Sequence, residues 1–201
     1  MLADLDATLE ALLKRELPAA LVAATAISFE PPDAGFTTSG VTLPAIDLFL
    51  YDVRENTALR SNDRPLERPA NGAPIRHPPL TRVDCSYLVT AWASGQGPSP
   101  AQDEHRLLAA VLKVLVRFPL VPDDLLVGEL KGVGPPLPIV RLSPDPLQNP
   151  AELWQALGGK PKAALSLTVT AAVPVGPPEA AEPLVKERVI EIHQGAAPSD
   201  A

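Results

Sequence analysis

The segment LFLYDVREN, residues 48–56, constrains the fold more than any other part of this chain. Apolar residues alternate here over both faces of an extended segment. They are Ile46, Leu48 and Leu50 on one face, and Phe49, Tyr51 and Val53 on the other. A strand that is apolar on both faces is covered on both faces, so we expect a central strand. A polar group follows it directly, which indicates that this end of the strand contacts something outside the fold.

Residues 81–92 predict a second long strand, which we expect to pair with residues 46–53. Its apolar face holds Val83, Cys85, Tyr87, Val89 and Ala91, and its other face largely holds Arg82, Asp84, Ser86 and Thr90. Trp92 at the end of this strand and Trp154 later in the chain are large apolar side chains that we expect to pack in the core.

Two main helices are predicted to cover the sheet. Leucines at helical spacing in residues 2–17 predict the first helix, which Pro18 ends. Ser99 and Gln102 predict a capping box at the start of the second helix, whose apolar stripe runs to Phe118.

The remaining pattern predicts shorter elements. These are a strand at 26–29, a projecting excursion or hairpin at 61–79 with an Asn71-Gly72 turn, a helix at 150–158, a strand at 165–170, a loop at 174–183 and an edge strand at 186–193. The fold class is therefore α+β: a twisted, mixed or antiparallel sheet with two main helices packed on it. We expect one domain over residues 1–194 and a disordered tail at 195–201.

Composition narrows the function classes. Seventeen basic against 24 acidic residues give a net charge of −7, which argues against non-specific binding to nucleic acid or to an anionic membrane surface. The single cysteine, Cys85, leaves no intrachain disulfide. The N-terminus has acids where a secretory signal needs positive charge, and no apolar run reaches the length of a membrane span. We expect a soluble cytoplasmic protein.

Cys85 beside Asp84, with His105 further along the chain, is the nearest arrangement to a nucleophilic site. A thiol nucleophile needs a base within hydrogen-bond reach. Cys85 lies on the apolar face of its strand, however, so a packed core thiol is the stronger interpretation. The three histidines show no metal-ligand spacing, and the glycines form no phosphate-binding motif. We therefore expect no catalytic, metal or cofactor site.

Two charged groups indicate interaction with another protein. Residues 54–82 contain twice as many arginines as acids, although the chain is acidic elsewhere. There are three acids and six arginines: Arg54, Arg60, Arg64, Arg68, Arg76 and Arg82. Arginine suits bidentate pairing with the carboxylates of a partner. The alternative is a solvated loop with scattered charges. The second group opens the predicted second helix, where the helix dipole explains Asp103 and Glu104 but not His105 and Arg106.

Together these segments resemble a known family. The succession LADLDATLEALLKRELP, LFLYDVRENTALRSND, RVDCSYLVTAWA, DEHRLL and NPAELWQALGG covers most of the chain from Leu2 to about Val169. It is similar to the tube-terminator, or cap, proteins of extracellular contractile injection systems, which are related to phage tails.

The resemblance implies a fold like that of phage tail terminators and a structural protein without enzymatic activity. It implies a ring, expected to be a hexamer, that ends the inner tube and contacts the last sheath ring. On this interpretation the protein interface includes Arg54, Asn56, Arg60, Arg64 and Asp84, and the DEHR turn of Asp103, Glu104, His105 and Arg106. The partners would be the chain itself, the tube protein and the sheath protein. Assembly would take place in the bacterial cytoplasm, with release of the particle on lysis.

Two alternatives remain open at this point. One is a monomeric adaptor or assembly chaperone that binds a partner through residues 54–82 and is absent from the finished particle. The other is a small cysteine hydrolase that uses Cys85, Asp84 and His105, against which the expected burial of Cys85 already counts.

Overall fold

Long antiparallel strands form the centre of the structure. The computed structural model describes residues 1–38, 40–69, 73–95, 98–132, 139–142 and 150–181. Within these residues the main sheet has five strands in the order β1-β2-β5-β7-β6. Their bounds are β1 Ala26–Ser28, β2 Ala45–Glu55, β5 Leu80–Trp92, β6 Ile139–Leu142 and β7 Ala164–Pro174. β1 is parallel to β2 and the other neighbours are antiparallel, so the sheet is mixed.

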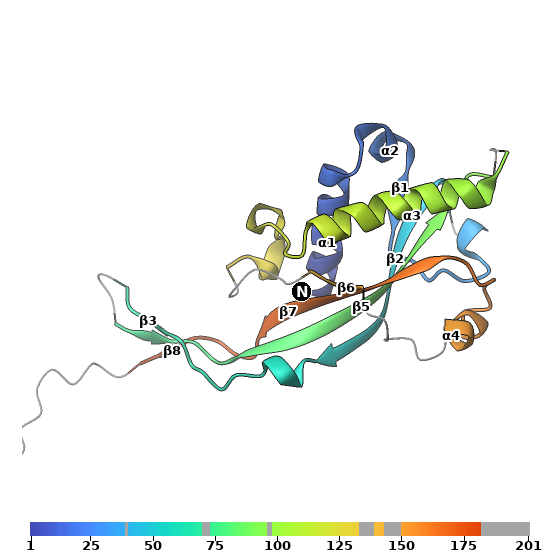
Figure 1. The fold of residues 1–201 in the computed structure, drawn as a ribbon. Helices are drawn as coiled ribbons and strands as arrows, with labels where there is room; N and C mark the ends of the chain where they lie inside the picture. The colour runs from blue at the N-terminus through green and yellow to red at the C-terminus, as the bar shows by residue number, and fades with distance from the viewer. Residues whose placement is uncertain (39, 70–72, 96–97, 133–138, 143–149, 182–201) are drawn as a thin grey trace, which may run out of the picture.

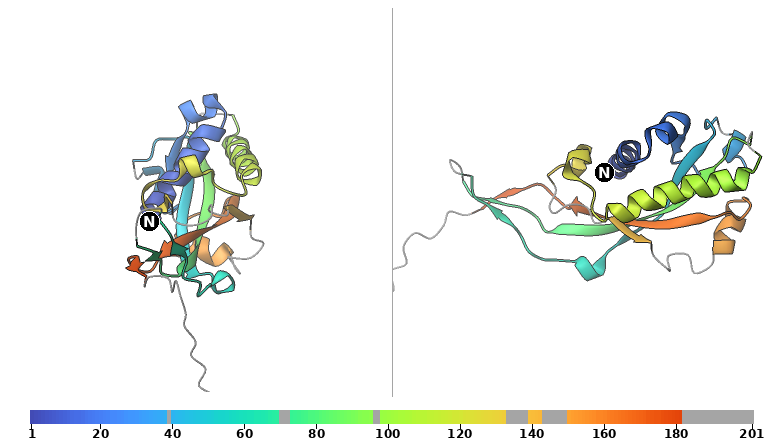
Figure 2. Two further views of the ribbon diagram at one scale, coloured as in Figure 1. Left: turned by 90° about the vertical axis from the view of Figure 1, so that its left-hand side faces the viewer. Right: turned by 45° about the horizontal axis from the view of Figure 1, so that its top comes forward.

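Two main helices, α1 (Leu2–Glu16) and α3 (Pro100–Arg117), lie on one face of the main sheet (Figure 1). The short helix α4 (Pro150–Ala156) lies on the other face, as the turned views in Figure 2 also show. The shorter helical segments are α2 (Ala19–Ala24), η1 (Phe36–Thr38), η2 (Thr57–Leu59), η3 (Asp123–Leu125) and η4 (Gly128–Leu130). This arrangement confirms the predicted α+β class. None of the described helices is long and apolar enough to cross a membrane.

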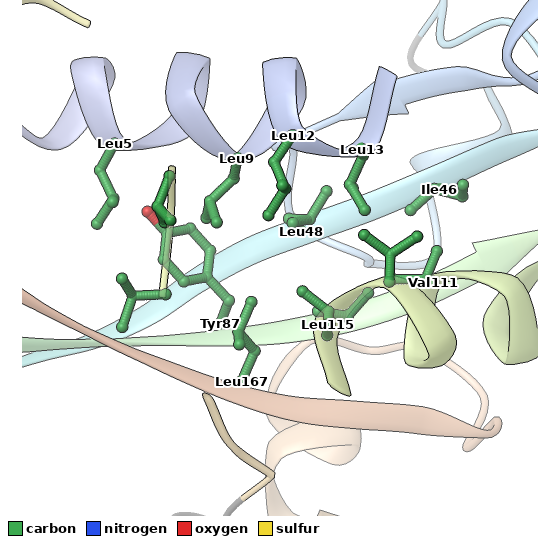
Figure 3. Close-up of a cluster of buried hydrophobic side chains, with 14 of the residues drawn as sticks. Leu5, Leu9, Leu12, Leu13, Ile46, Leu48, Tyr87, Val111, Leu115 and Leu167 are labelled. Carbon is green, nitrogen blue, oxygen red and sulfur yellow. The ribbon is translucent and has the colours of Figure 1, made fainter. Parts of the chain in front are cut away.

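The core lies between the two main helices and the sheet (Figure 3). Its largest fully buried side chains include Leu5, Leu9, Leu12 and Leu13 of α1, Ile46 and Leu48 of β2, Tyr87 of β5, Val111 and Leu115 of α3, and Leu167 of β7. Burying each of these side chains contributes about 1.5–3 kcal/mol. The hydroxyl of Tyr87 donates a hydrogen bond to the Asp6 carboxylate at 2.7 Å, which satisfies the one polar group of this side chain.

A second, small sheet forms an arm that projects from the end of the main sheet (Figures 1 and 2). Its strands are β3 (Leu66–Glu67), β4 (Ile75–Arg76) and β8 (Glu179–Ala180). β4 pairs with both other strands, antiparallel in each case. The projecting hairpin predicted for residues 61–79 is confirmed. The prediction of a loop at 174–183 is wrong at β8, because those two residues complete the small sheet.

The predicted alternation of side chains along β2 is wrong after Leu50, because the strand contains a β-bulge. The register shifts between Leu50 and Asp52, so that Leu50 is opposite Tyr87 and Val53 is opposite Cys85. An extra residue in one strand reverses the alternation of the residues after it. Val53 therefore shares a face with Leu50, and it is 45% exposed rather than buried. The buried part of β2 ends before the bulge.

Other local predictions need correction. Ser99 precedes α3, but its side chain makes no capping hydrogen bond, so the predicted capping box is not formed. Pro18 does end the first helix, yet α2 begins directly after it. β6 has no counterpart in the sequence prediction. The predicted Asn71-Gly72 turn, the edge strand at 186–193 and the disordered tail at 195–201 lie outside the described residues.

Both tryptophans pack against neighbouring side chains. Trp154 is buried, as predicted. Trp92 is half-buried: it stacks on Phe36 with ring centroids 4.4 Å apart, and the Lys162 ammonium lies 3.6 Å from its ring centroid. The indole N–H of Trp92 donates to the Thr90 hydroxyl at 2.9 Å. Trp92 is the last residue of β5, so this aromatic cluster lies at the end of that strand away from the arm.

Asp47 is fully buried beside this cluster, on the face of β2 opposite the main helices. Its Oδ2 accepts a hydrogen bond from the Thr90 hydroxyl at 3.4 Å, and Oδ1 has no partner among the described residues. Burial raises the pKa of Asp47 from 3.8 to about 8, although the Ser28 and Thr90 hydroxyls and Lys162 act in the other direction. The folded state therefore holds a proton on Asp47 at neutral pH.

We predict that Asp47→Asn flattens the dependence of stability on pH. Because the folded pKa lies above the unfolded one, the contribution of Asp47 to stability is fully present below about pH 4 and is lost as pH rises towards 8, by at most about 1.4 kcal/mol per pH unit. Urea unfolding between pH 4 and pH 9 measures this slope. The exposed Asp63→Asn serves as the control, and equal slopes in the wild type and Asp47→Asn would contradict the prediction.

Candidate protein interaction surface

A polar cluster closes the uncovered end of β2. The Asn56 amide donates to both carboxylate oxygens of Asp84, at 3.0 and 3.1 Å, and the Thr170 hydroxyl donates to the same carboxylate at 2.6 Å. The Asn56 side-chain oxygen accepts from the Leu59 N–H at 3.1 Å, at the start of η2. We call Asn56, Asp84 and Thr170 the Asp84 cluster. It links the residue that follows β2 to the first half of β5 and the second half of β7.

The arginines near this cluster extend into solvent. Arg54 pairs with Asp52 at 2.7 Å and is 78% exposed, while Arg60 makes two 2.8 Å hydrogen bonds to the carboxylate of Glu55. Surface ion pairs of this kind contribute little to stability and leave guanidinium groups accessible. Asn56 and Asp84 thus bond within the chain, whereas Arg54 and Arg60 present charge at the surface.

The arm exposes three arginines, Arg64, Arg68 and Arg76, against two glutamates, Glu67 and Glu179. Arg64 lies 3.9 Å from Glu179, and Arg68 and Arg76 are exposed without an ion-pair partner among the described residues. Large apolar side chains are exposed on the arm and on the segments that lead to it. Leu66 of β3, Val175 between β7 and β8, Val53 of β2 and Leu59 of η2 are all more than a third exposed. Small sheets of two-residue strands are marginally stable alone in water. Exposed apolar side chains gathered at such a small projecting sheet are typical of a protein interaction surface.

Sequence reasoning found the arginines of this surface but missed its apolar residues. Leu59, Leu66 and Val175 lie outside the strands and helices predicted from periodicity. The sequence does carry a signal for them. Large apolar residues that stand alone in proline-rich segments belong to no helix or strand face that would bury them. The alternation of residues 48–53 predicts a covered Val53, because the sequence does not reveal the bulge.

The DEHR turn lies at the far end of the molecule from the arm, at the start of α3 (Figure 1). Glu104 is used within the chain: it accepts from the Lys162 ammonium at 2.9 Å and from the Ala93 N–H at 3.4 Å. Asp103 accepts from Arg106 at 2.7 Å. His105 and Arg106 are exposed. The structure therefore separates the two predicted groups instead of bringing them together.

Cys85 is fully buried in the core, as predicted. Burial, and to a lesser extent the negative charges of Asp84 and Asp6, raise the pKa of its thiol to about 11. A nucleophile needs the thiolate, and His105 is exposed on α3. This geometry argues against the cysteine hydrolase. Among the described residues no cluster of His, Cys, Asp and Glu side chains is placed to hold a metal ion.

Comparison with known proteins finds one family and related structures. A family model described as the Pvc16 N-terminal domain matches residues 4–187. The chain is similar in fold to the sheath/tube terminator of an extracellular contractile injection system, PVC, in its extended state, with a TM-score of 0.70 and 22% identity over 99% of this chain. It is also similar to the tube-terminating cap of the anti-feeding prophage, with a TM-score of 0.68 and 22% identity over 96% of this chain.

The chain spans about two thirds of these two structures, 65% and 62% of their lengths. A search of curated protein sequences finds no match.

We predict that Asp84→Ala destabilises the fold whereas Arg54→Ala does not. Removing the carboxylate leaves the Asn56 and Thr170 donors without their acceptor, which costs about 1–3 kcal/mol of unfolding free energy. Arg54 is exposed, so its replacement changes stability by less than about 0.5 kcal/mol. Urea denaturation of both variants measures the difference. Equal stabilities would show that the Asp84 cluster does not hold the end of the sheet.

Alkylation of Cys85 provides a separate test of the hydrolase alternative. We expect iodoacetamide to modify the native protein far more slowly than the urea-unfolded protein, because the thiol is buried and its pKa is raised. Mass spectrometry over a time course follows the reaction. Rapid modification of the native chain would restore the hydrolase as a candidate.

Proposed function

The chain belongs to the Pvc16 N-terminal domain family, and on this premise we propose that it is the sheath and tube terminator, or cap, of a contractile injection system related to phage tails. The observation that carries the proposal is the fold match over 99% of the chain to a structure described as a sheath/tube terminator. The family match over residues 4–187 also supports one domain at residues 1–194.

A cap performs this function by covering a surface and needs no catalysis. A growing tube presents an open, repeating end that keeps adding subunits until a different protein covers it. The cap therefore needs one surface that fits the tube or sheath and another that joins its own copies. An exposed arm and exposed arginines supply contact surfaces of this kind. The protein is accordingly a structural component rather than an enzyme.

The proposed interface divides into two roles. Arg54, Arg60 and Arg64 contact a partner directly, because their guanidinium groups are largely exposed. Asn56 and Asp84 act on the interface by fixing the course of the chain between β2 and η2.

In the DEHR turn, His105 and Arg106 are the exposed candidates for a second contact, and Asp103 and Glu104 hold the turn in place.

The proposed partners are further copies of this chain, the inner-tube protein and the sheath protein. We expect a hexameric ring that assembles in the bacterial cytoplasm and remains part of the particle, which is released on lysis. Half-exposed charge pairs at such contacts set orientation and association rate more than affinity.

We predict that the purified chain forms a closed ring, either alone or on tube ends. The measurement is the particle mass over a range of concentrations, with and without the tube protein of the same system. A ring supports the cap. A chain that stays monomeric, and is absent from tubes and from purified particles, would instead identify the adaptor or chaperone.

We also predict that the double replacement Arg54→Ala and Arg60→Ala weakens assembly without unfolding the chain. Both side chains are exposed and, within the part of the chain that the structure describes, pair only with neighbouring acids, so the fold keeps its stability. Binding to tube ends is measured beside the melting temperature. A matched control replaces Lys113, an exposed cation of α3, with alanine. Loss of the fold in the double variant would mean that these arginines are structural.

A further inference from the structure

The arm has a counterpart of opposite charge on the same chain. Residues 120–130 follow α3 and contain η3 and η4; we call them the acidic segment. Asp123, Asp124 and Glu129 are its charged residues, and all three are exposed. Leu120 and Val127 are its exposed large apolar residues, at 49% and 36%. The acidic segment thus combines negative charge with exposed apolar area, as the arm and the segments that lead to it combine an excess of arginine over glutamate with exposed apolar area.

The charges of the acidic segment are firmly placed. Asp124 accepts from Arg15 of α1 at 2.7 Å, and Glu129 lies 3.1 Å from the N-terminal ammonium. Both carboxylates nevertheless remain 71% exposed. Asp123 has no ion pair among the described residues. Backbone contacts to α1, such as the Val127 N–H on the Thr8 hydroxyl at 3.2 Å, hold the segment against the body of the protein. It is therefore a fixed surface that can receive a partner without reorganising.

Within one chain the arm does not contact the charged groups of the acidic segment. No hydrogen bond or ion pair joins the arm to the acidic segment in the described part of the molecule. Figure 1 shows why: the arm points away from the body, while η3 and η4 lie against α1 and the end of α3. Opposite charges that are both exposed, and that one chain cannot bring together, fit a contact between two chains.

We propose that the arm of one copy docks on the acidic segment of a second copy of this chain. Arg68 and Arg76 of the arm face the carboxylates of Asp123 and Glu129, and the exposed leucines and valines of the two surfaces cover each other. Repeated from copy to copy, such a contact closes into a ring if its rotation closes. This inference rests on the proposed function and names the surfaces through which the cap joins its own copies.

The occupant is a second copy rather than an unrelated acidic protein because both complementary surfaces are present on one chain. The arm alone would accept any acidic partner. The acidic segment of the same chain offers what the arm needs in a partner. It has negative charge and exposed apolar area, and both are held at a fixed position. Docking would also cover an arm whose own strands are only two residues long.

A charge-swap experiment tests the contact. The arm variant carries Arg68→Glu and Arg76→Glu, and the segment variant carries Asp123→Arg and Glu129→Arg. Each variant alone places like charges opposite each other, so we expect self-association to weaken by at least about tenfold. An equimolar mixture of the two variants places opposite charges across every contact between unlike copies, and we expect it to restore association. Sedimentation velocity measures the species over a range of concentrations, with circular dichroism to verify folding.

A control variant reverses two exposed cations outside both surfaces, Lys113→Glu and Lys160→Glu, and should associate like the wild type. Restored association in the mixture supports the proposal. Three results would overturn it: single variants that associate normally, folded variants whose mixture stays dissociated, or a wild type that is monomeric both alone and on tube ends.

Capping of tube ends, measured in the same samples, separates the two proposals. Normal capping by the charge-reversed variants, with unchanged self-association, would leave the cap function standing and remove only this contact. Failure of the wild type itself to bind tube ends would remove the proposed function.

Discussion

The pairing of β5 with β2 on one side and β7 on the other is the interaction on which the rest of the structure depends. Every residue of β5 from Val83 to Trp92 has a partner in β2, and those from Leu80 to Thr90 have one in β7. The helical layer covers only part of this length. β2 is buried at its start and exposed at its end, and β5 is more exposed at its start, so the uncovered ends of the two strands lie together. The arm grows from that uncovered end.

An uncovered sheet end needs a substitute for core packing, and the Asp84 cluster supplies it. One carboxylate accepts hydrogen bonds from residues of two other segments, Asn56 after β2 and Thr170 in β7. Charge-assisted hydrogen bonds of this kind are stronger than neutral ones. The opposite end of the sheet is closed differently, by Phe36 stacked on Trp92 and by Lys162 between Glu104 and the indole ring. The two ends thus leave different surfaces to solvent.

The asymmetry of these ends bears on function. On the proposed function, a cap contacts unlike neighbours, namely its own copies, the tube and the sheath, and different surfaces on one molecule suit such contacts. Exposed charges steer and orient such contacts, while the accompanying apolar residues provide the buried area. The net charge of −7 limits non-specific attraction to polyanions despite the arginines of the arm.

The sequence alone determined the features that depend on residues close together in the chain. The two helices, the two long strands and the burial of Cys85 follow from periods of 3.6 and 2 residues, since periodicity decides which side chains share a face. Only the tertiary structure decided the bulge after Leu50, the small strand β8 and the use of Asn56 and Asp84 within the chain. Asp84 meets partners 28 and 86 residues away. Such contacts are fixed by strand register, which no local pattern specifies.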